Sequence, residues 1–194
     1  MPIQLDVLKN SLGQEVLVNG YPRQPGQIVE YLSTPLDGTD MIGESGTYDT
    51  LSVDSQVTTS TSYADVPGSS INYTPPTAAT RVIYQFHFSS QWTTTAHSIQ
   101  HFKFFVDGVE VLHARHNRSS TYYEDREKFE WIIPIGVIAN TNTGRQAAWT
   151  TAKNLKLQTR RYATNSQDLN GTVYWDGATS NVFSRPQITI IAIA

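Results

Sequence analysis

The sequence predicts an all-β protein: an antiparallel, jelly-roll-like β-sandwich with a short β-prone arm at its N-terminus. Short segments rich in Val, Thr, Tyr and Phe recur along the chain between Gly, Pro, Asn and Asp residues. No segment has the apolar spacing of a long amphipathic helix. Roughly ten short strands without a long helix favour two packed sheets with Greek-key connections.

The clearest core strand lies near the middle of the chain. Four apolar side chains recur at every second position of residues 81–88 and so share one face of a strand: Val82, Tyr84, Phe86 and Phe88. Further along, Asp107 and Gly108 separate two apolar segments. This pair is the strongest hairpin signal in the chain, because a two-residue type I′ turn needs positive φ at both positions.

Other segments add to the strand pattern. We expect strands over residues 28–32, 128–134, 147–150, 154–160 and 187–193. Residues 122–129 can hold at most a helical turn or two, since they lack an apolar stripe.

Residues 1–26 differ from the rest and predict an arm that attaches the domain of residues 27–194 to a neighbour. The apolar residues expected to dock are Ile3, Leu5, Val7, Val16 and Val18. Pro22 and Pro25 stiffen the segment that follows them. The alternative is that residues 1–26 form an ordinary first pair of strands of the same sandwich.

Composition narrows the function classes. The 194 residues suit one β domain, and the absence of cysteine excludes disulfides and favours assembly in a reducing compartment. A net charge of −3 offers no basic excess for nucleic acid. Neither a transmembrane run nor a secretory signal is present, so we expect no membrane insertion. Charged residues make up only 16%, which is typical of virion proteins and of subunits that bury surface.

Five histidines invite a metal interpretation: His87, His97, His101, His113 and His116. No zinc-binding spacing occurs among them, and His113 and His116 would lie on opposite faces of one strand. We therefore expect no metal site and no cofactor, although histidines of different subunits can still meet on a symmetry axis.

The acidic residues near position 127 do not predict catalysis. Glu124, Asp125, Glu127 and Glu130 alternate with Arg126 and Lys128, which favours ion pairs over the two separated carboxylates of a glycosidase. No nucleophile elbow or phosphate-binding loop is present. We expect a protein without enzymatic activity, and a glycan depolymerase is the alternative.

Aromatic residues beside polar loops are the candidate binding residues. Tyr122, Tyr123, Trp175 and Asp176, with Trp92 as a further candidate, are suited to stacking on sugar rings or to anchoring an interface. They indicate a carbohydrate-binding surface. The alternative is that they pack at the edge of the sandwich.

Several segments resemble one group of proteins, the small virion structural proteins of tailed phages of cyanobacteria and other marine hosts. These segments are 25–32 (PGQIVEYL), 36–38 (LDG), 61–76 (TSYADVPGSSINYTPP), 101–108 (HFKFFVDG), 114–119 (ARHNRS), 131–136 (WIIPIG) and 174–177 (YWDG). The likeness covers most of residues 25–194, and the arm is less typical.

The resemblance implies a virion part, assembled in the host cytoplasm and commonly homotrimeric, that contacts other virion proteins through an N-terminal attachment segment. A tail-fibre role, with a host-surface glycan as a further partner, is the leading expectation. A capsid decoration (cement) protein is the alternative. The resemblance implies no catalytic residues.

Overall fold

The computed structural model describes residues 17–18, 21–22, 24–92, 98–120, 124–162, 167–175 and 179–194. Regular structure in these ranges is almost entirely β. Two antiparallel sheets of six strands each form the body, and the described ranges contain a single short 3₁₀ turn, η1 (Leu112–Ala114). The predicted fold class, an all-β sandwich of the jelly-roll kind, is confirmed.

The first sheet is built around its longest strand, β9. Its six strands are β3 (Ile28–Pro35), β18 (Gln187–Ile193), β9 (Arg81–Trp92), β13 (Glu124–Pro134), β15 (Gln167–Leu169) and β6 (Val57–Thr58). The order is β3-β18-β9-β13, and β15 takes the place of β18 beside the last residues of β9.

The second sheet is built around β10 and β14. Its strands are β7 (Ala64–Asp65), β8 (Ile71–Tyr73), β10 (Ser98–Val106), β11 (Val109–Glu110), β12 (His116–Ser120) and β14 (Lys153–Arg161). Three two-stranded ribbons complete the structure: β1 (Leu17–Val18) with β2 (Tyr21–Pro22), β4 (Met41–Gly43) with β5 (Gly46–Tyr48), and β16 (Gly171–Trp175) with β17 (Thr179–Phe183).

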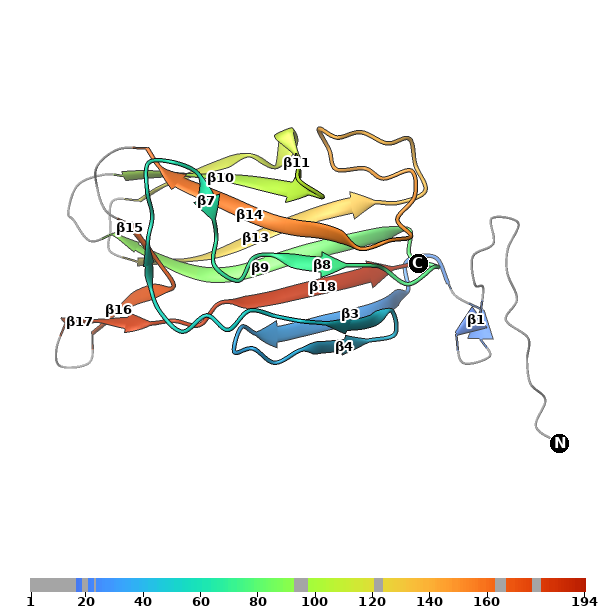
Figure 1. Cartoon of the computed structure of the whole chain (residues 1–194), viewed down its shortest axis with the longest axis horizontal. Helices are drawn as coiled ribbons and strands as arrows, with labels where there is room; N and C mark the ends of the chain where they lie inside the picture. The colour runs from blue at the N-terminus through green and yellow to red at the C-terminus, as the bar shows by residue number, and fades with distance from the viewer. Residues whose placement is uncertain are drawn as a thin grey trace.

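The chain passes repeatedly between the two sheets. It changes sheet between β9 and β10, between β12 and β13, and between β14 and β15 (Figure 1). This winding makes strands that follow one another in sequence face each other across the core, as in a jelly roll.

The predicted hairpin at Asp107 and Gly108 is confirmed. Both residues have positive φ, 53° and 77°, and Val106 lies opposite Val109. The returning strand β11 is short, however, because the chain leaves the sheet at η1 and resumes pairing with β10 as β12.

The core lies between the sheets, where the predicted alternation of β9 is observed. Val82, Tyr84, Phe86 and Phe88 are each at most 5% exposed. The rings of Tyr84 and Phe104 lie 5.0 Å apart across the core, and those of Phe88 and Phe102 lie 5.6 Å apart. Aromatic residues from both sheets therefore interlock along the sandwich.

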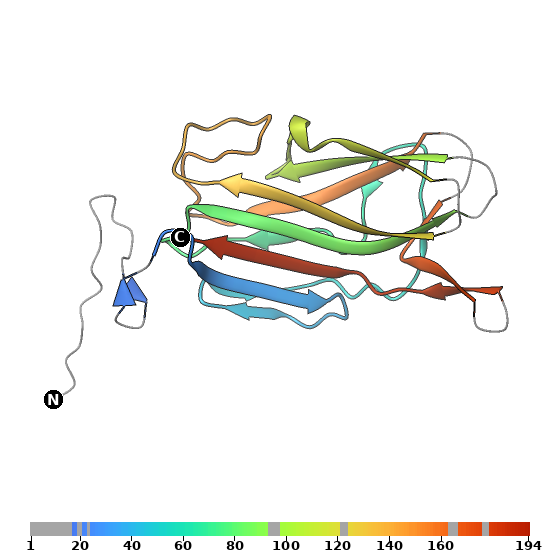
Figure 2. The same cartoon turned by 180° about the vertical axis from the view of Figure 1, so that it is seen from behind.

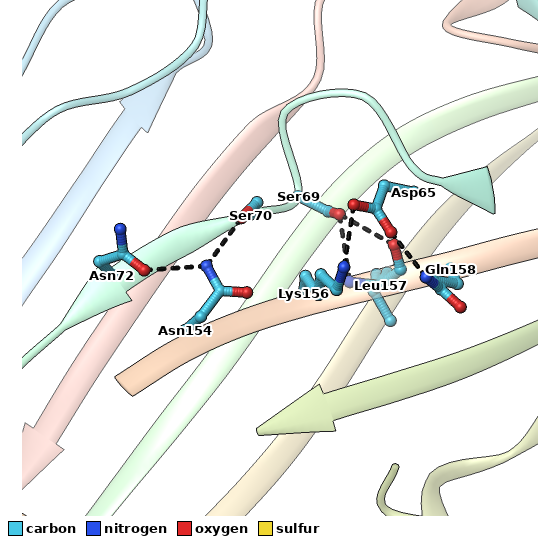
Figure 3. A network of polar contacts seen from close by, with 8 residues as sticks. All are labelled: Asp65, Ser69, Ser70, Asn72, Asn154, Lys156, Leu157 and Gln158. Atoms are coloured by element: carbon cyan, nitrogen blue, oxygen red, sulfur yellow. Dashed lines mark hydrogen bonds and ion pairs between the residues drawn. The ribbon is translucent and has the colours of Figure 1, made fainter. Parts of the chain in front are cut away.

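A serine replaces part of the strand ladder beside β14. β7 and β8 pair with different parts of β14, and Leu157 lies between the two paired stretches. The Leu157 N–H donates to Ser69 Oγ at 3.1 Å, and the Ser69 hydroxyl donates to the Leu157 carbonyl at 3.2 Å (Figure 3). Ser69 is fully buried, so its side chain satisfies backbone groups that water cannot reach.

Two local expectations are wrong. Residues 147–150 form no strand; instead, Trp149 is buried from a loop and its indole N–H donates to the Tyr73 carbonyl at 3.1 Å. The described part of 122–129 is strand, because β13 begins at Glu124 and pairs with β9 along its whole length. Cross-strand pairing overrides the weak local preference there.

The predicted arm is described only in part. Ile3, Leu5, Val7 and Val16 lie outside the described residues, and Val18 pairs with Tyr21 in the β1–β2 ribbon. Figures 1 and 2 place β1 beyond the end of the sandwich at which the C-terminus lies. The chain enters the body there, since Gly26 N donates to the Ala194 carbonyl at 2.7 Å. The division between residues 26 and 27 stays a prediction.

In the ranges that the structure describes, no helix is long and apolar enough to cross a membrane.

Candidate functional site

The sandwich has two ends. We name the one at which the chain enters from the predicted arm the arm end, and the opposite one the loop end. At the arm end, Gly26 bonds to Ala194, and Ile193, Arg81 and Pro134 are neighbours on adjacent strands. At the loop end lie the ends of the strands on either side of residues 93–97, 121–123, 163–166 and 176–178. Trp92 lies opposite Gln167 there. The 12 residues of β9 run from one end to the other, a span of roughly 36 Å.

Of the four predicted binding residues, the structure describes Trp175 alone. Tyr122, Tyr123 and Asp176 lie outside the described residues. Trp175 is the last residue of β16, opposite Thr179 of β17, and both views place this ribbon at the loop end (Figures 1 and 2). That these residues share one binding surface stays a prediction.

Beneath the loop end, the core changes from apolar to polar. Phe88 and Phe102 pack against each other near this end of the core. Closer to the loop end, polar side chains that are at most 7% exposed gather on the inner and outer faces of the strands: Ser89, Ser90, Gln91, Gln100, Arg118, Gln167 and Asn170. We name these seven residues the polar layer. Such burial is unusual, because a buried polar group costs free energy unless it is hydrogen-bonded.

Arg118 joins the two sheets through the polar layer. It extends from β12 of the second sheet, and its Nε lies 2.6 Å from Glu127 Oε1 of β13 in the first. Its Nη1 donates to Ser90 Oγ of β9. Burial lowers the pKa of the guanidinium and the Glu127 carboxylate opposes this shift. The buried cation is thus compensated by a direct ion pair.

Two amide side chains of the polar layer are without partners in the described structure. The amide nitrogen and oxygen of Gln100, and those of Asn170, make no hydrogen bond although both residues are fully buried. Buried polar groups are nearly always hydrogen-bonded to protein or ordered water. These two amides are therefore suited to bonding ordered water inside the protein.

A polar cleft of about 250 Å³ opens on the first sheet toward the loop end. Its lining residues are His87, Phe88, Ser89, Arg126, Glu127, Ser184, Arg185 and Gln187. Arg126 is exposed and makes no ion pair within the described ranges. Burial, followed by the nearby Lys128 charge, lowers the pKa of His87 and favours its neutral form. The cleft offers hydrogen-bond donors suited to a hydroxyl- or carboxylate-bearing ligand.

Arg185 is held in place by the chain that surrounds it. Its Nη1 donates to the carbonyls of Leu36 and Val53 at 2.6 and 2.9 Å, and its Nη2 donates to Asp54 Oδ1 at 2.8 Å. Its guanidinium also lies over the Phe183 ring. Arg185 therefore builds one wall of the cleft, and His87, Arg126 and Gln187 are better placed to contact a ligand.

The histidines are dispersed. The expectation that His113 and His116 share one strand is wrong, because His113 lies in η1 and His116 in β12. His116 stacks on Phe102 with ring centroids 4.7 Å apart, and His101 bonds to Asn117. His97 lies outside the described residues. Within the described ranges, no three His, Cys, Asp or Glu residues are grouped so that they could hold a metal ion.

Sequence reasoning missed the polar layer and the cleft. Part of the layer could have been predicted from the sequence, because Ser90 and Gln100 occupy the next inward positions after Phe88 and before Phe102 on their strands. The cleft could not, because Arg126, His87 and Gln187 come from three strands that are distant in sequence.

Comparisons with known proteins add little to this geometry. No family model and no curated protein matches the chain. Among the solved structures that match is one of infectious bursal disease virus, Gx strain, at 12% identity and a TM-score of 0.35. The match covers 89% of this chain but 38% of that one, so this chain spans well under half of its length. Similarity at this level carries no argument on function, and the fold class rests on the strand pairing described above.

Proposed function

We propose that this chain is a structural protein of a bacteriophage particle, fibre-like in role, which docks through residues 1–26 and displays the loop end of its sandwich. The observation that carries the proposal is the position of the two ends. The chain enters the body beside Ala194, whereas Trp92 and Gln167, which end their strands at the loop end, lie at the opposite end of β9. An attachment segment and a displayed surface are thereby kept apart.

The composition and the resemblance of residues 25–194 to phage virion proteins support this proposal. The chain has no cysteine, so it can fold in a reducing host cytoplasm before assembly into the virion. Ile3, Leu5 and Val7 alternate with polar residues, which suits a strand added to the edge of a neighbouring sheet. Its expected partners are other virion proteins and further copies of itself, as a homotrimer, without enzymatic activity or nucleic-acid contact.

Incorporation into particles tests the docking role. Phage would be grown with this protein supplied as wild type, without residues 1–26, or with Ile3, Leu5 and Val7 all changed to Ser. We expect both altered proteins to be missing from purified particles. A matched control changes the alternate polar positions Gln4 and Asp6 to Ser and should incorporate normally. Near-ultraviolet circular dichroism would check that each variant is folded.

Normal incorporation of the truncated protein would contradict docking by residues 1–26. The position of the protein in an intact particle map separates the two roles. Density on the tail supports a fibre, whereas density on the capsid surface supports the alternative of a decoration protein.

Carbohydrate binding at the loop end is a second candidate function, and it is compatible with the first. The observation that favours it is the polar cleft, with Arg126, His87 and Gln187 directed to one hollow. Binding would be measured by titration with host-surface polysaccharide. We expect Arg126→Ala and Trp175→Ala to weaken it. Arg145→Ala is the matched control, because Arg145 is exposed in a loop joined to the arm end through the Gln146–Pro134 bond.

Unchanged binding in both the Arg126→Ala and the Trp175→Ala variants would remove this candidate. A depolymerase is tested in the same samples by measuring new reducing ends after incubation with the polysaccharide. We expect none, and their appearance would contradict the non-enzymatic proposal.

A further inference from the structure

The polar cleft occupies a gap in the strand pairing of the first sheet. β18 begins with Gln187 opposite His87, and β15 ends opposite Ser90. Neither ladder therefore includes Phe88 or Ser89. Figure 2 shows the chain before β18 turning away from β9 toward the β16–β17 ribbon. The hollow of about 250 Å³ is thus a consequence of strand order and register.

Side chains from three strands meet at this gap on the outer face of the sheet. Phe88 faces the core, so its neighbours His87 and Ser89 face outward. Arg126 of β13 lies opposite Ser89 and shares that face. Gln187 of β18 lies opposite His87 on the other side. The register therefore brings a guanidinium, an imidazole and an amide to one place.

Most of these groups have no partner within the protein. Four lining side chains make no hydrogen bond and no ion pair in the part of the chain that the structure describes: His87, Arg126, Ser184 and Gln187. The buried hydroxyl of Ser89 also has no hydrogen-bond partner. Buried polar groups are nearly always bonded, so this floor is unusual. The cleft thus presents unused donors and acceptors to a ligand.

The charged residues of the lining leave one cation available. Glu127 lies 2.6 Å from the buried Arg118, which compensates its charge. Arg185 is paired with Asp54 at 2.8 Å. Arg126 is therefore the uncompensated charge among the described lining residues.

Charges beside the cleft do not neutralise Arg126. Lys128 lies opposite His87, and its Nζ is 2.7 Å from Glu130 Oε2, so these two charges compensate each other. Asp168 lies farther toward the loop end, opposite Gln91, and does not line the cleft. Its carboxylate accepts from Thr58 Oγ1 at 2.6 Å. An anionic group is therefore the complement that the cleft favours.

The size and the neutral groups of the cleft narrow the ligand further. Ligand pockets commonly measure about 300–1,000 Å³, so a cleft of about 250 Å³ suits one sugar ring. Burial lowers the pKa of His87, so its ring is neutral near pH 7 and offers one donor and one acceptor. The Gln187 amide also offers both. Such groups match hydroxyls, whereas a guanidinium matches a carboxylate.

We propose that the cleft binds one acidic sugar of a glycan, with Arg126 on the sugar carboxylate and with His87 and Gln187 on its hydroxyls. This inference rests on the second candidate function, carbohydrate binding, and adds the class of sugar. A neutral sugar leaves the Arg126 charge without a partner. An acidic peptide supplies the carboxylate but lacks the ring hydroxyls that the other side chains match.

Calorimetric titration of the full chain tests the class of sugar. The probes are trisaccharides of galacturonic, glucuronic and mannuronic acid, each beside its methyl ester, which keeps every ring hydroxyl and removes the charge. We expect at least one acid to bind about tenfold more tightly than its ester at low salt. Added salt should reduce this preference, because it screens the exposed Arg126 charge.

Variants assign the preference to Arg126. Arg126→Ala should weaken binding of the acid to the level of its ester and leave binding of the ester nearly unchanged. Arg126→Lys keeps the charge without the planar fork and should retain part of the preference. Arg145→Ala is the matched control, since it removes the same charge from an exposed loop joined to the arm end, and it should bind as wild type does.

Four results would overturn the proposal. The first is equal binding of each acid and its ester. The second is an equal loss of the preference in Arg145→Ala, which would indicate a general charge effect. The third is a hexaglutamate peptide that binds as tightly as the best trisaccharide, which would assign the cleft to an acidic protein. The fourth is binding of host polysaccharide without binding of any acidic trisaccharide, which leaves carbohydrate binding intact and removes only this inference.

Discussion

Replacing Ser69 with Ala removes a buried hydroxyl. It tests how the backbone of β14 is hydrogen-bonded at Leu157, between the stretches that pair with β7 and β8. Ser69 Oγ accepts from Leu157 N at 3.1 Å and donates to the Leu157 carbonyl at 3.2 Å. The carbonyl keeps a second donor, Val66 N at 2.9 Å. The Leu157 N–H has no such replacement, so the Ala variant leaves a buried donor without an acceptor.

The expected cost follows from that single donor. An unsatisfied buried N–H costs about 1–3 kcal/mol, so we expect a loss of about 2 kcal/mol in the free energy of unfolding. For a domain of this size, each kcal/mol lowers Tm by about 2–4 °C, which predicts a decrease of about 4–8 °C. The control is Ser70→Ala, because Ser70 is exposed and Asn154 Nδ2 keeps its bond to Asn72 Oδ1 at 2.9 Å. It should change stability by less than about 0.5 kcal/mol.

Urea unfolding followed by tryptophan fluorescence, at one protein concentration, measures both variants against wild type. Equal stability of the two alanine variants would refute the reasoning, because it would mean that the Leu157 N–H finds another acceptor or that water reaches it. A large loss in both would also count against it, since Ser70 would then share the structural role assigned to Ser69.

Two further predictions concern a close approach and a titration. Gly43→Ala places a Cβ against the buried Glu30 carboxylate, which bonds to Tyr73 and Ser45 hold in place, so we expect a loss of about 1–3 kcal/mol in the free energy of unfolding, measured in urea. Ile42→Ala, at an 81% exposed neighbour, should change it little. Burial lowers the pKa of His116, so the unfolded chain takes up a proton first and stability should fall as the pH drops below about 6.5. His116→Phe, which keeps the ring stacked on Phe102, should reduce that fall between pH 7 and pH 5, and an unchanged pH dependence would contradict this assignment.

Much of the fold could be predicted because its signals are local. The type I′ turn at Asp107 and Gly108 depends on two residues that tolerate positive φ. The inward face of β9 depends on alternation within eight residues. The failures at 122–129 and 147–150 have a non-local cause: pairing with β9 makes Glu124–Pro134 a strand, and Trp149 is drawn into the core from a loop.

The candidate site could be predicted less well. Of the candidate binding residues chosen from the sequence, Trp175 ends β16 and Tyr122, Tyr123 and Asp176 lie outside the described residues, so their binding role stays a prediction. The polar layer was not anticipated, although Gln100 occupies an inward position of its strand. A polar side chain at an inward position can lie inside the apolar core or at its end, where water reaches it. The alternation of apolar and polar residues along a strand does not distinguish the two.

The sequence alone determined the fold class, the central hairpin, the inward alternation of β9 and the absence of disulfides. Only the tertiary structure decided which outward residues are neighbours. Tyr31, Ile83, Ile132 and Ile191 each look like an ordinary exposed residue of a separate strand. They form one continuous line across β3, β18, β9 and β13 because strand order and register bring them side by side, and both depend on contacts between distant parts of the chain. Alternation within a strand specifies a face, whereas pairing between strands determines what that face contains.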